Sequence, residues 1–323
     1  AADDSLNKAR NIVDKGLDKL TLMAGLKGRS LYAVGGIWRT LALVDMDEQN
    51  YPLHVLHNYA IPAPRALKLC KVISGLSRKS LEKIRSVPKR RAEALPYGAL
   101  VMERMIQAGG LAEVVVSAYG LREGVHYRHL PPDEAAKDPV LEFAAEFNAR
   151  ESRNPALARE LISWTAKLYP KESAADRRLR EAACLLADIA WRRHPDDRAA
   201  GAFAQVLRGP YAGATHRERA IIATAVHYRY SGSDEFPEES AVARLLGPES
   251  SVQALRLGLA ARLAFALVGS VKDELLSMPL NVSNHLLSLS VPARCRALLG
   301  ENVTKRLNDL AEAFGRKGEV LIT

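Results

Sequence analysis

The sequence predicts two architectures in one chain, an α/β layer over residues 1–132 and an all-α region over residues 133–323. Three observations predict this. Before residue 130, short apolar runs alternate with helical patterns and turn glycines, which is typical of an α/β layer. Prolines and an aspartate at 131–133 then interrupt the pattern. Beyond them the chain is rich in Ala, Leu and Arg at helical spacing, so we expect a second, helical domain.

The elements of the first domain follow from hydrophobic periodicity and from the positions of glycine and proline. In order, we expect a helix at 1–29, a strand at 32–34, a helix at 37–46, extended chain at 51–59, short helices at 66–74 and 80–84, a helix at 97–108 and a strand at 113–117. Pro62 and Pro64 should end the extended stretch, and Gly109-Gly110 should end the last helix.

The second domain is predicted from longer apolar stripes separated by glycine and proline clusters. We expect helices at about 139–151, 156–168, 174–193, 199–208, 216–229, 238–246, 250–268 and 300–315. Weak alternation over 271–291 predicts a hairpin, and 319–322 is a candidate strand.

Composition narrows the class of protein. The chain has 323 residues, room for about two domains. Its three cysteines, Cys70, Cys184 and Cys295, are widely spaced, which excludes a disulfide framework and fits a reducing cytoplasm. No apolar run reaches the roughly 18 residues of a membrane span, so we expect a cytoplasmic protein that does not associate with membranes.

The net charge of +9 is concentrated in one segment. Ten basic residues and one acid, Glu82, lie between Arg65 and Arg91, so this segment carries an excess of +9 by itself. Such a cluster indicates a polyanionic partner, and the alternative is an ordinary solvated helix face. Nucleic acid is an unlikely partner, because no aromatic residue lies between Tyr59 and Tyr97 to stack on bases.

Two glycine-containing segments follow apolar runs. The first is Tyr32-Ala33-Val34-Gly35-Gly36-Ile37-Trp38-Arg39, and the second runs from Ser117 to Gly124. A strand that turns through glycine into a helix brings backbone N–H groups and a helix N-terminus together, which favours anion binding.

Together these two segments resemble signatures of the Ppx/GppA family of exopolyphosphatases and guanosine pentaphosphate phosphatases. The resemblance implies an actin-like fold with ribonuclease-H-like halves, Mg²⁺, and one phosphate loop in each half. Neither the Asp-x-Gly-Ser-Asn-Ser-x-Arg loop nor the Asp-x-Gly-Gly-Gly-Ser loop occurs here. We therefore expect the C-terminal part of an exopolyphosphatase, that is, the remainder of the second actin-like half plus a helical domain. Such a chain would be inactive by itself, and its Mg²⁺ would be bound mainly outside it.

The resemblance also assigns candidate residues. Gly35, Gly36 and Arg39 match the family's Gly-Gly-x-x-Arg loop, which borders the active cleft. Arg122 and Glu123 match positions near the hinge between the two halves. The alternative for the glycines is a tight strand–helix turn, and for the charged residues local ion pairs.

The stretch 181–196 resembles the metal-binding helix of HD-domain phosphohydrolases, but Ala187 stands where the paired His is needed, and Asp188 remains. Asp188, His194 and His216 are weak metal candidates. The preferred interpretation is an HD-like helical scaffold without its metal, with Asp188 paired to Arg192 four residues later.

Further residues are expected to contact polyphosphate. They are Arg65, Lys68, Lys71, Arg90, Arg91, Arg192, Arg193, Arg217 and Arg229. Many weak contacts of this kind would supply affinity and processivity. The remaining expected partners are the N-terminal catalytic half of the same protein and a second copy in a homodimer. Guanosine pentaphosphate as substrate, or a purely structural or dimerisation role, are the alternative functions.

Overall fold

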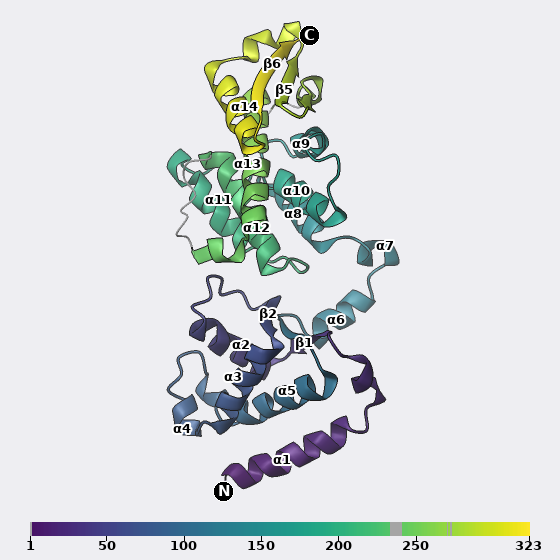
Figure 1. The fold of residues 1–323 in the computed structure, drawn as a ribbon, viewed down its shortest axis with the longest axis vertical. Coiled ribbons are helices and arrows are strands. Elements are labelled where there is room, and N and C mark those ends of the chain that lie inside the picture. Colours follow the sequence, from purple (N-terminus) through teal and green to yellow (C-terminus); the bar gives the residue numbers. More distant parts are fainter. Residues whose placement is uncertain (1, 233–240, 270, 272) are drawn as a thin grey trace. The chain divides into compact units, whose positions relative to one another are not determined.

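The computed structural model describes residues 2–232, 241–269, 271 and 273–323. The chain divides into two compact units, Ala1–Ala135 and Ala136–Thr323. This division lies three residues beyond the domain boundary expected from the sequence. Figure 1 shows the elements of each unit.

The first unit is built on a three-stranded sheet in the order β1-β3-β2. β1 (Ser30–Val34) pairs in parallel with β3 (Glu113–Ser117), so that Val34 lies opposite Ser117. β2 (Tyr59–Pro62) pairs antiparallel with β3. Because β2 is an edge strand, Pro62 at its end removes no hydrogen bond that an inner strand would need.

The first unit also contains helices, of which the second and third pack against the sheet and the fifth packs against those two (Figure 1). The helices are α1 (Ala2–Leu17), α2 (Gly36–Glu48), α3 (Ala63–Gly75), α4 (Arg78–Leu81), α5 (Leu95–Gly109), α6 (Leu121–Arg128) and α7 (Pro132–Ala135), with 3-10 turns at Thr21–Gly25 and Lys89–Arg91. One core cluster joins the sheet residues Val114 and Val116 to Leu41 of α2, Ile73 of α3 and Met102 of α5.

Most of the predicted elements of this unit are confirmed, and three differ from the structure. The helix expected at 80–84 is α4, which ends at Leu81 and is followed by turns. The first helix ends at Leu17 rather than continuing to residue 29, after the weak helix former Gly16. The second strand begins at Tyr59, because Asn58 has a left-handed backbone (φ 62°) that interrupts an extended chain. Gly110 ends α5 in the left-handed conformation, as the sequence predicted.

The second unit is mainly helical. Its helices are α8 (Pro139–Glu151), α9 (Leu157–Ala166), α10 (Ala174–Leu185), α11 (Arg198–Leu207), α12 (His216–Ser231), α13 (Pro248–Val268) and α14 (Glu301–Ala313). Short 3-10 turns lie at Pro195–Asp197, Ala241–Leu245, Leu275–Ser277 and Ala293–Leu298.

A small sheet closes this unit, in the order β4-β5-β6. β4 (Leu280–Val282) and β5 (Leu286–Val291) form the predicted hairpin. β6 (Lys317–Ile322) pairs in parallel with β5 and confirms the predicted last strand. Leu287 and Leu289 of β5 pack in one core with Leu263 of α13, Leu307 of α14 and Trp164 of α9.

Two predicted helices of this unit differ from the structure. The one at 174–193 ends at Leu185, and turns follow in which every residue from Leu186 to Ala190 is buried. A surface helix buries only one face, so five consecutive buried residues do not fit its continuation. Of the helix predicted at 238–246, residues 241–245 form a 3-10 turn, and 238–240 lie outside the described residues.

α13 is the one helix among the described residues whose length and apolarity would suffice to cross a membrane. Within its most apolar window, 56% is already buried inside the protein. Its central residues Leu259, Leu263 and Leu267 belong to the core of the second unit. Burial to this extent is typical of a helix in the core of a folded domain.

Candidate anion-binding site

The two glycine-containing segments lie side by side at one edge of the first unit's sheet. β1 ends at Val34 and β3 ends at Ser117, and these residues are register partners in the parallel pair. The loops that follow therefore leave the sheet from the same edge, where ligands of α/β sheets commonly bind. Arg39 of α2 joins the two loops, because its Nε donates to the carbonyl oxygen of Ser117 at 3.1 Å.

The N-terminus of α2 has the geometry of an anion site. Gly35 has φ 130°, a conformation that other residues rarely adopt, and it caps α2 without a side chain. A Cβ on Gly36 would lie 2.6 Å from Nη2 of Arg91. Glycine at this position thus allows the guanidinium of Arg91 to approach the helix start, where uncapped N–H groups favour negative charge.

Arg91 is held in this place by a chain of hydrogen bonds. Its Nη1 donates to Oγ1 of Thr40 at 2.8 Å, and Thr40 donates to the carbonyl oxygen of Gly36 at 3.0 Å. The structure thus brings together four of the predicted residues, Gly35, Gly36, Arg39 and Arg91. Two guanidinium groups and one helix N-terminus can together hold a phosphate group.

The backbone N–H groups of the second loop are already hydrogen-bonded to side chains of the protein. The amides of Ala118, Tyr119 and Gly120 donate to Nδ1 of His57, Oγ of Ser117 and Oε2 of Glu123, at 3.4, 3.1 and 2.6 Å. Bonds from its own backbone amide and from that of Gly120 lower the pKa of the Glu123 carboxyl, with smaller contributions from Arg122 and Arg39. Glu123 is thus a helix cap. The N–H groups of the second loop are therefore already bonded to protein groups, which speaks against the expectation that this loop offers them to an anion.

Aromatic side chains flank the second loop and the neighbouring strand. The rings of His57 and Tyr119 meet edge to face with centroids 4.7 Å apart. Tyr32 of β1 is 67% exposed and Tyr119 38% exposed. Arg122, on the first turn of helix α6, is exposed at this edge.

Of the basic segment between Arg65 and Arg91, Arg91 reaches this edge, whereas Arg65 at the other end of the segment does not. Arg65 of α3 lies 3.1 Å from Oδ2 of the buried Asp45, which also accepts a 2.6 Å hydrogen bond from Tyr59. Asp45, Arg65 and Lys68 line a cavity of about 550 Å³. Since Asp45 is nine residues along α2 from Gly36, this cavity lies about 14 Å from the helix start. Arg65 is therefore a structural partner of Asp45.

Most cations of the segment have no carboxylate partner among the described residues. Arg65 pairs with Asp45, Arg78 pairs with Glu82 and Glu93, and Arg91 is bound to Thr40. The seven that remain of the ten are all exposed, and they are Lys68, Lys71, Lys79, Lys83, Arg85, Lys89 and Arg90. This concentration of unneutralised charge is what the sequence predicted.

In the second unit, Asp188 is the centre of a buried ion cluster. Arg153 donates to both of its carboxylate oxygens, at 2.7 and 2.9 Å, and Arg229 lies 3.6 Å away. The expected pair with Arg192 is thus wrong, because the turn after Leu185 directs Asp188 into the interior. Burial lowers the pKa of Arg229 to about 10, and its guanidinium packs 4.0 Å above the Phe265 ring. Arg229 is therefore a core residue rather than a substrate contact.

The metal candidates do not form a metal site. Both oxygens of Asp188 are occupied by Arg153, and His194 is an exposed residue whose Nδ1 accepts from the amide of Asp196. His216 is buried at the start of α12. Across the described ranges there is no group of three or more His, Cys, Asp and Glu that could hold a metal ion.

The three remaining arginine candidates have different partners. Arg192 is exposed and stacks on Trp191, 4.9 Å from the ring centre. Arg193 pairs with Asp197 at 3.1 Å. Arg217 donates to Oγ of Ser250 and has no carboxylate partner in the part of the chain described.

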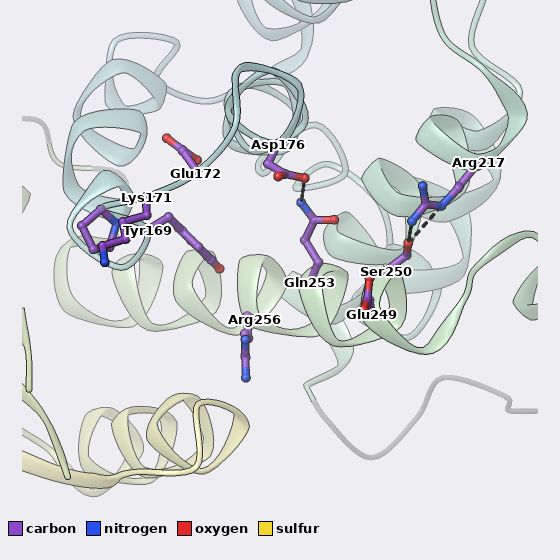
Figure 2. Close-up of a pocket in the computed structure, with 10 residues that line it drawn as sticks. Tyr169, Lys171, Glu172, Asp176, Arg217, Glu249, Ser250, Gln253 and Arg256 are labelled. Atoms are coloured by element: carbon purple, nitrogen blue, oxygen red, sulfur yellow. Dashed lines mark hydrogen bonds between the residues drawn. The ribbon is translucent and has the colours of Figure 1, made fainter. Parts of the chain in front are cut away.

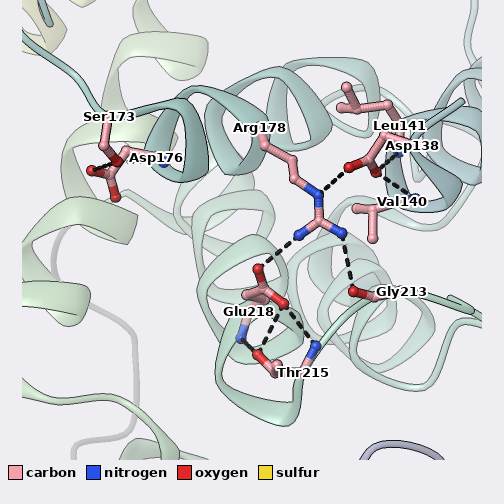
Figure 3. A network of polar contacts seen from close by, with 9 residues as sticks. All are labelled: Asp138, Val140, Leu141, Ser173, Asp176, Arg178, Gly213, Thr215 and Glu218. Carbon is pink, nitrogen blue, oxygen red and sulfur yellow. Dashed lines mark hydrogen bonds and ion pairs between the residues drawn. The ribbon is translucent and has the colours of Figure 1, made fainter. Parts of the chain in front are cut away.

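Sequence reasoning missed Arg178, which links three segments of the second unit (Figure 3). From α10 it donates to Asp138 before α8 at 2.5 Å, to Glu218 of α12 at 2.7 Å and to the carbonyl of Gly213 at 3.0 Å. Asp138 caps α8, and Glu218 closes a capping box with Thr215. The pair Asp138-Pro139 is a helix-start signal that can be recognised in the sequence. No sequence pattern indicates that Asp138 bonds to Arg178.

Comparison with known proteins shows which family the two units resemble. Residues 140–321 match the family described as exopolyphosphatase, C-terminal, and residues 2–133 match the Ppx/GppA phosphatase family. The crystal structure of the Aquifex aeolicus member of the Ppx/GppA family is 20% identical, with a TM-score of 0.32. That alignment covers 38% of this chain and 40% of the Aquifex chain. No curated protein matches the chain.

Proposed function

Because the chain belongs to the Ppx/GppA phosphatase family, we propose that it binds inorganic polyphosphate and holds it for removal of terminal phosphate. The proposal assigns the first unit to an actin-like phosphatase half and the second to an HD-like helical domain. The observation that carries it is a set of seven exposed cations on and around α3 and α4 that have no carboxylate partner in the ranges the structure describes. A polyphosphate chain is a linear polyanion, and such a cluster is its electrostatic complement.

The residues would act at two places. Arg39, Arg91 and the N-terminus of α2 would hold one phosphate group at the carboxyl edge of the sheet. The exposed cations of the basic segment would hold further phosphates, each contact raising the local concentration for the next. In this assignment Arg65 and Arg229 are structural, since each is committed to a buried aspartate.

The described residues do not fit the Mg²⁺ that family members use. No metal-binding group of three acidic, His or Cys residues occurs among them, and Glu123 at the carboxyl edge is occupied as a helix cap. Hydrolysis also needs an in-line water and a base near the phosphate loops, which this sequence does not contain. The role proposed for this chain is therefore binding, and no chemical step is assigned to it.

Guanosine pentaphosphate remains a second candidate ligand because of one observation. The exposed rings of Tyr32 and Tyr119 lie on β1 and on the loop after β3, whose ends are register partners. A purine could stack on such rings while its phosphates reach the start of α2. Competition between guanosine pentaphosphate and long polyphosphate for this chain separates the two.

The test is binding of long-chain polyphosphate across a salt series, in wild type and in the triple variant Lys68→Gln, Lys71→Gln, Arg90→Gln. We expect log affinity to fall linearly with log salt, by about 0.7 per contact if polyphosphate behaves as a single-stranded polyanion. Removal of three contacts should therefore flatten the slope by about 2.

The matched control is Lys15→Gln, Lys19→Gln, Lys305→Gln, which removes three exposed lysines outside the segment. It should leave the slope within experimental error of wild type. Equal slopes for all three proteins, or no binding at low salt, would reject the proposal and leave a structural or dimerisation role.

A further inference from the structure

A cavity of about 470 Å³ lies between the start of α10 and the first half of α13. Figure 2 shows its lining, with Arg217 and Ser250 at one end, Gln253 and Asp176 in the middle, and Tyr169 and Lys171 toward the other end. The basic segment of the first unit contributes nothing to it. Its volume suits a small molecule rather than a polymer.

Two fixed guanidinium groups lie along this cavity. Arg217 donates two hydrogen bonds to Oγ of Ser250, at 3.1 and 2.5 Å. Arg256 donates from Nε to the carbonyl of Ala313 at 2.8 Å and stacks 4.5 Å above the Phe314 ring. Neither has a carboxylate within ion-pair distance in the described parts of the chain, so both positive charges are available to a ligand.

Two of the three carboxylates that line the cavity, Glu172 and Asp176, are bound by other groups. Arg180 donates to both oxygens of Glu172, at 2.6 and 2.9 Å, and both side chains are buried. Asp176 accepts from Oγ of the capping Ser173 and, at 2.9 Å, from Nε2 of Gln253.

Glu249 lines the same end of the cavity as Arg217 and Ser250, and it is an exposed carboxylate without an ion-pair partner among the described residues (Figure 2). The middle of the cavity is polar and rich in hydrogen-bonding groups, and the cations of its lining are Arg217, Arg256 and Lys171.

A buried polar group without a partner adds an independent observation. Tyr169 is one of the lining residues, and its hydroxyl is buried and makes no hydrogen bond within the described part of the chain. A buried hydroxyl that lacks a partner is costly, so a ligand that supplies one gains affinity. Arg256 is among the charged groups near this hydroxyl, which places the two at the same end of the cavity.

The spacing of the two cationic ends defines the class of ligand. Ser250, which anchors Arg217, and Arg256 are six residues apart on α13, or about 9 Å along the helix. A single phosphate group is too small to meet both ends. We propose that this cavity binds a sugar bisphosphate, with one phosphate at Arg217 and the other at Arg256 and Tyr169. The hydroxyl groups between the phosphates would meet Asp176 and Gln253.

The probes are fructose 1,6-bisphosphate, fructose 6-phosphate and tetrapolyphosphate, with binding to the full chain measured by calorimetry. We expect the bisphosphate to bind at least tenfold more tightly than the monophosphate, because only it reaches both cationic ends. Tetrapolyphosphate has a similar span without hydroxyl groups and should bind more weakly than the bisphosphate. Equal or tighter binding of tetrapolyphosphate would overturn the assignment and make the cavity a polyphosphate contact.

Three variants test the residues. Arg217→Gln and Arg256→Gln should each reduce the affinity for the bisphosphate to that for the monophosphate. Tyr169→Phe should weaken bisphosphate binding about five- to tenfold, while the Tm of the free protein stays equal or rises, because an unpaired buried hydroxyl is removed. Arg159→Gln, an exposed arginine of the same unit outside the cavity, is the matched control and should bind as wild type.

Unchanged bisphosphate affinity in the three cavity variants would overturn the proposal, as would the absence of binding to wild type. The triple variant Lys68→Gln, Lys71→Gln, Arg90→Gln separates this proposal from polyphosphate binding. This variant should lose affinity for polyphosphate and keep the affinity of wild type for the bisphosphate. A bisphosphate signal that disappears in this variant would contradict a site in the second unit.

Discussion

At the residue scale, the same residue type has opposite roles in different surroundings. Arg91 approaches the start of α2 because Gly36 has no Cβ, and it keeps its charge accessible to an anion. Arg229 lies in the core beside Asp188 and Phe265, where burial lowers its pKa to about 10. Both were candidate phosphate contacts in the sequence. Only the surroundings that folding creates distinguish a ligand contact from a structural ion pair.

The substitution Asp188→Asn tests the buried cluster. It removes the carboxylate that meets Arg153 and lies 3.6 Å from Arg229, and leaves the Arg229 charge buried without its counter-ion. We expect the free energy of unfolding to fall by about 3 kcal/mol, measured by urea denaturation.

The control for Asp188→Asn is Glu82→Gln, which breaks the pair with Arg78 on the surface. It should lower the free energy of unfolding far less than Asp188→Asn does, because solvent screens an exposed ion pair. If Asp188→Asn costs no more than this control, the cluster does not stabilise the fold.

At the element scale, caps and cross-links position the helices of the second unit. Asp138 accepts bonds from the amides of Val140 and Leu141 at the start of α8 and from Arg178 of α10. Glu218 does the same for α12, with Thr215 and Arg178 as donors. A single arginine thus satisfies the caps of two helices at once. The sequence marked the helix starts, but the partner that joins them is 40 residues away from each.

The pH dependence of stability follows from Asp138. Burial raises the pKa of its carboxyl, but the bond from Arg178 and the two capping amides outweigh this and lower the pKa below 3.8. The folded pKa is therefore below the unfolded one, so the stabilisation is complete above about pH 4 and lost as pH falls through the folded pKa.

Urea midpoints between pH 7 and pH 2.5 check this. Wild type should exceed Asp138→Asn at pH 7, and the gap should close on acidification below pH 4. Glu146→Gln, an exposed carboxylate on the same helix, should show no such gap. A difference between wild type and Asp138→Asn that is constant with pH would show that the carboxylate charge is not the cause.

At the scale of the whole molecule, the charge is divided unequally between the two units. Residues 1–135 carry 20 basic and 14 acidic residues, an excess of +6, and residues 136–323 carry 26 and 23, an excess of +3. The first unit also contains the basic segment and the carboxyl-edge loops. We therefore propose that the first unit supplies most of the polyphosphate affinity, and that the second unit, with its cavity of about 470 Å³, binds a small ligand.

A hydrolysis assay tests the role proposed for the whole chain. Incubated alone with polyphosphate and Mg²⁺, the chain should release no phosphate above the uncatalysed rate. Addition of a family polypeptide that carries both phosphate loops should restore release, since those loops supply the charge stabilisation that hydrolysis requires. Rapid phosphate release by the chain alone would contradict the binding role, and the triple lysine and arginine variant should slow any restored release.

The sequence by itself determined the order of elements, the basic segment and the resemblance that the family matches confirm. These depend on local periodicity, turn residues and composition, which can be read along the chain. Three features depend on the tertiary structure: Asp188 is buried with Arg229 beside it, the amides of the second loop are bonded within the protein, and Arg91 reaches Gly36. The physical reason is that burial and hydrogen-bond partners are set by contacts between residues far apart in the sequence. Arg153 and Asp188 are separated by 35 residues and Arg39 and Ser117 by 78, and no local pattern encodes either pair.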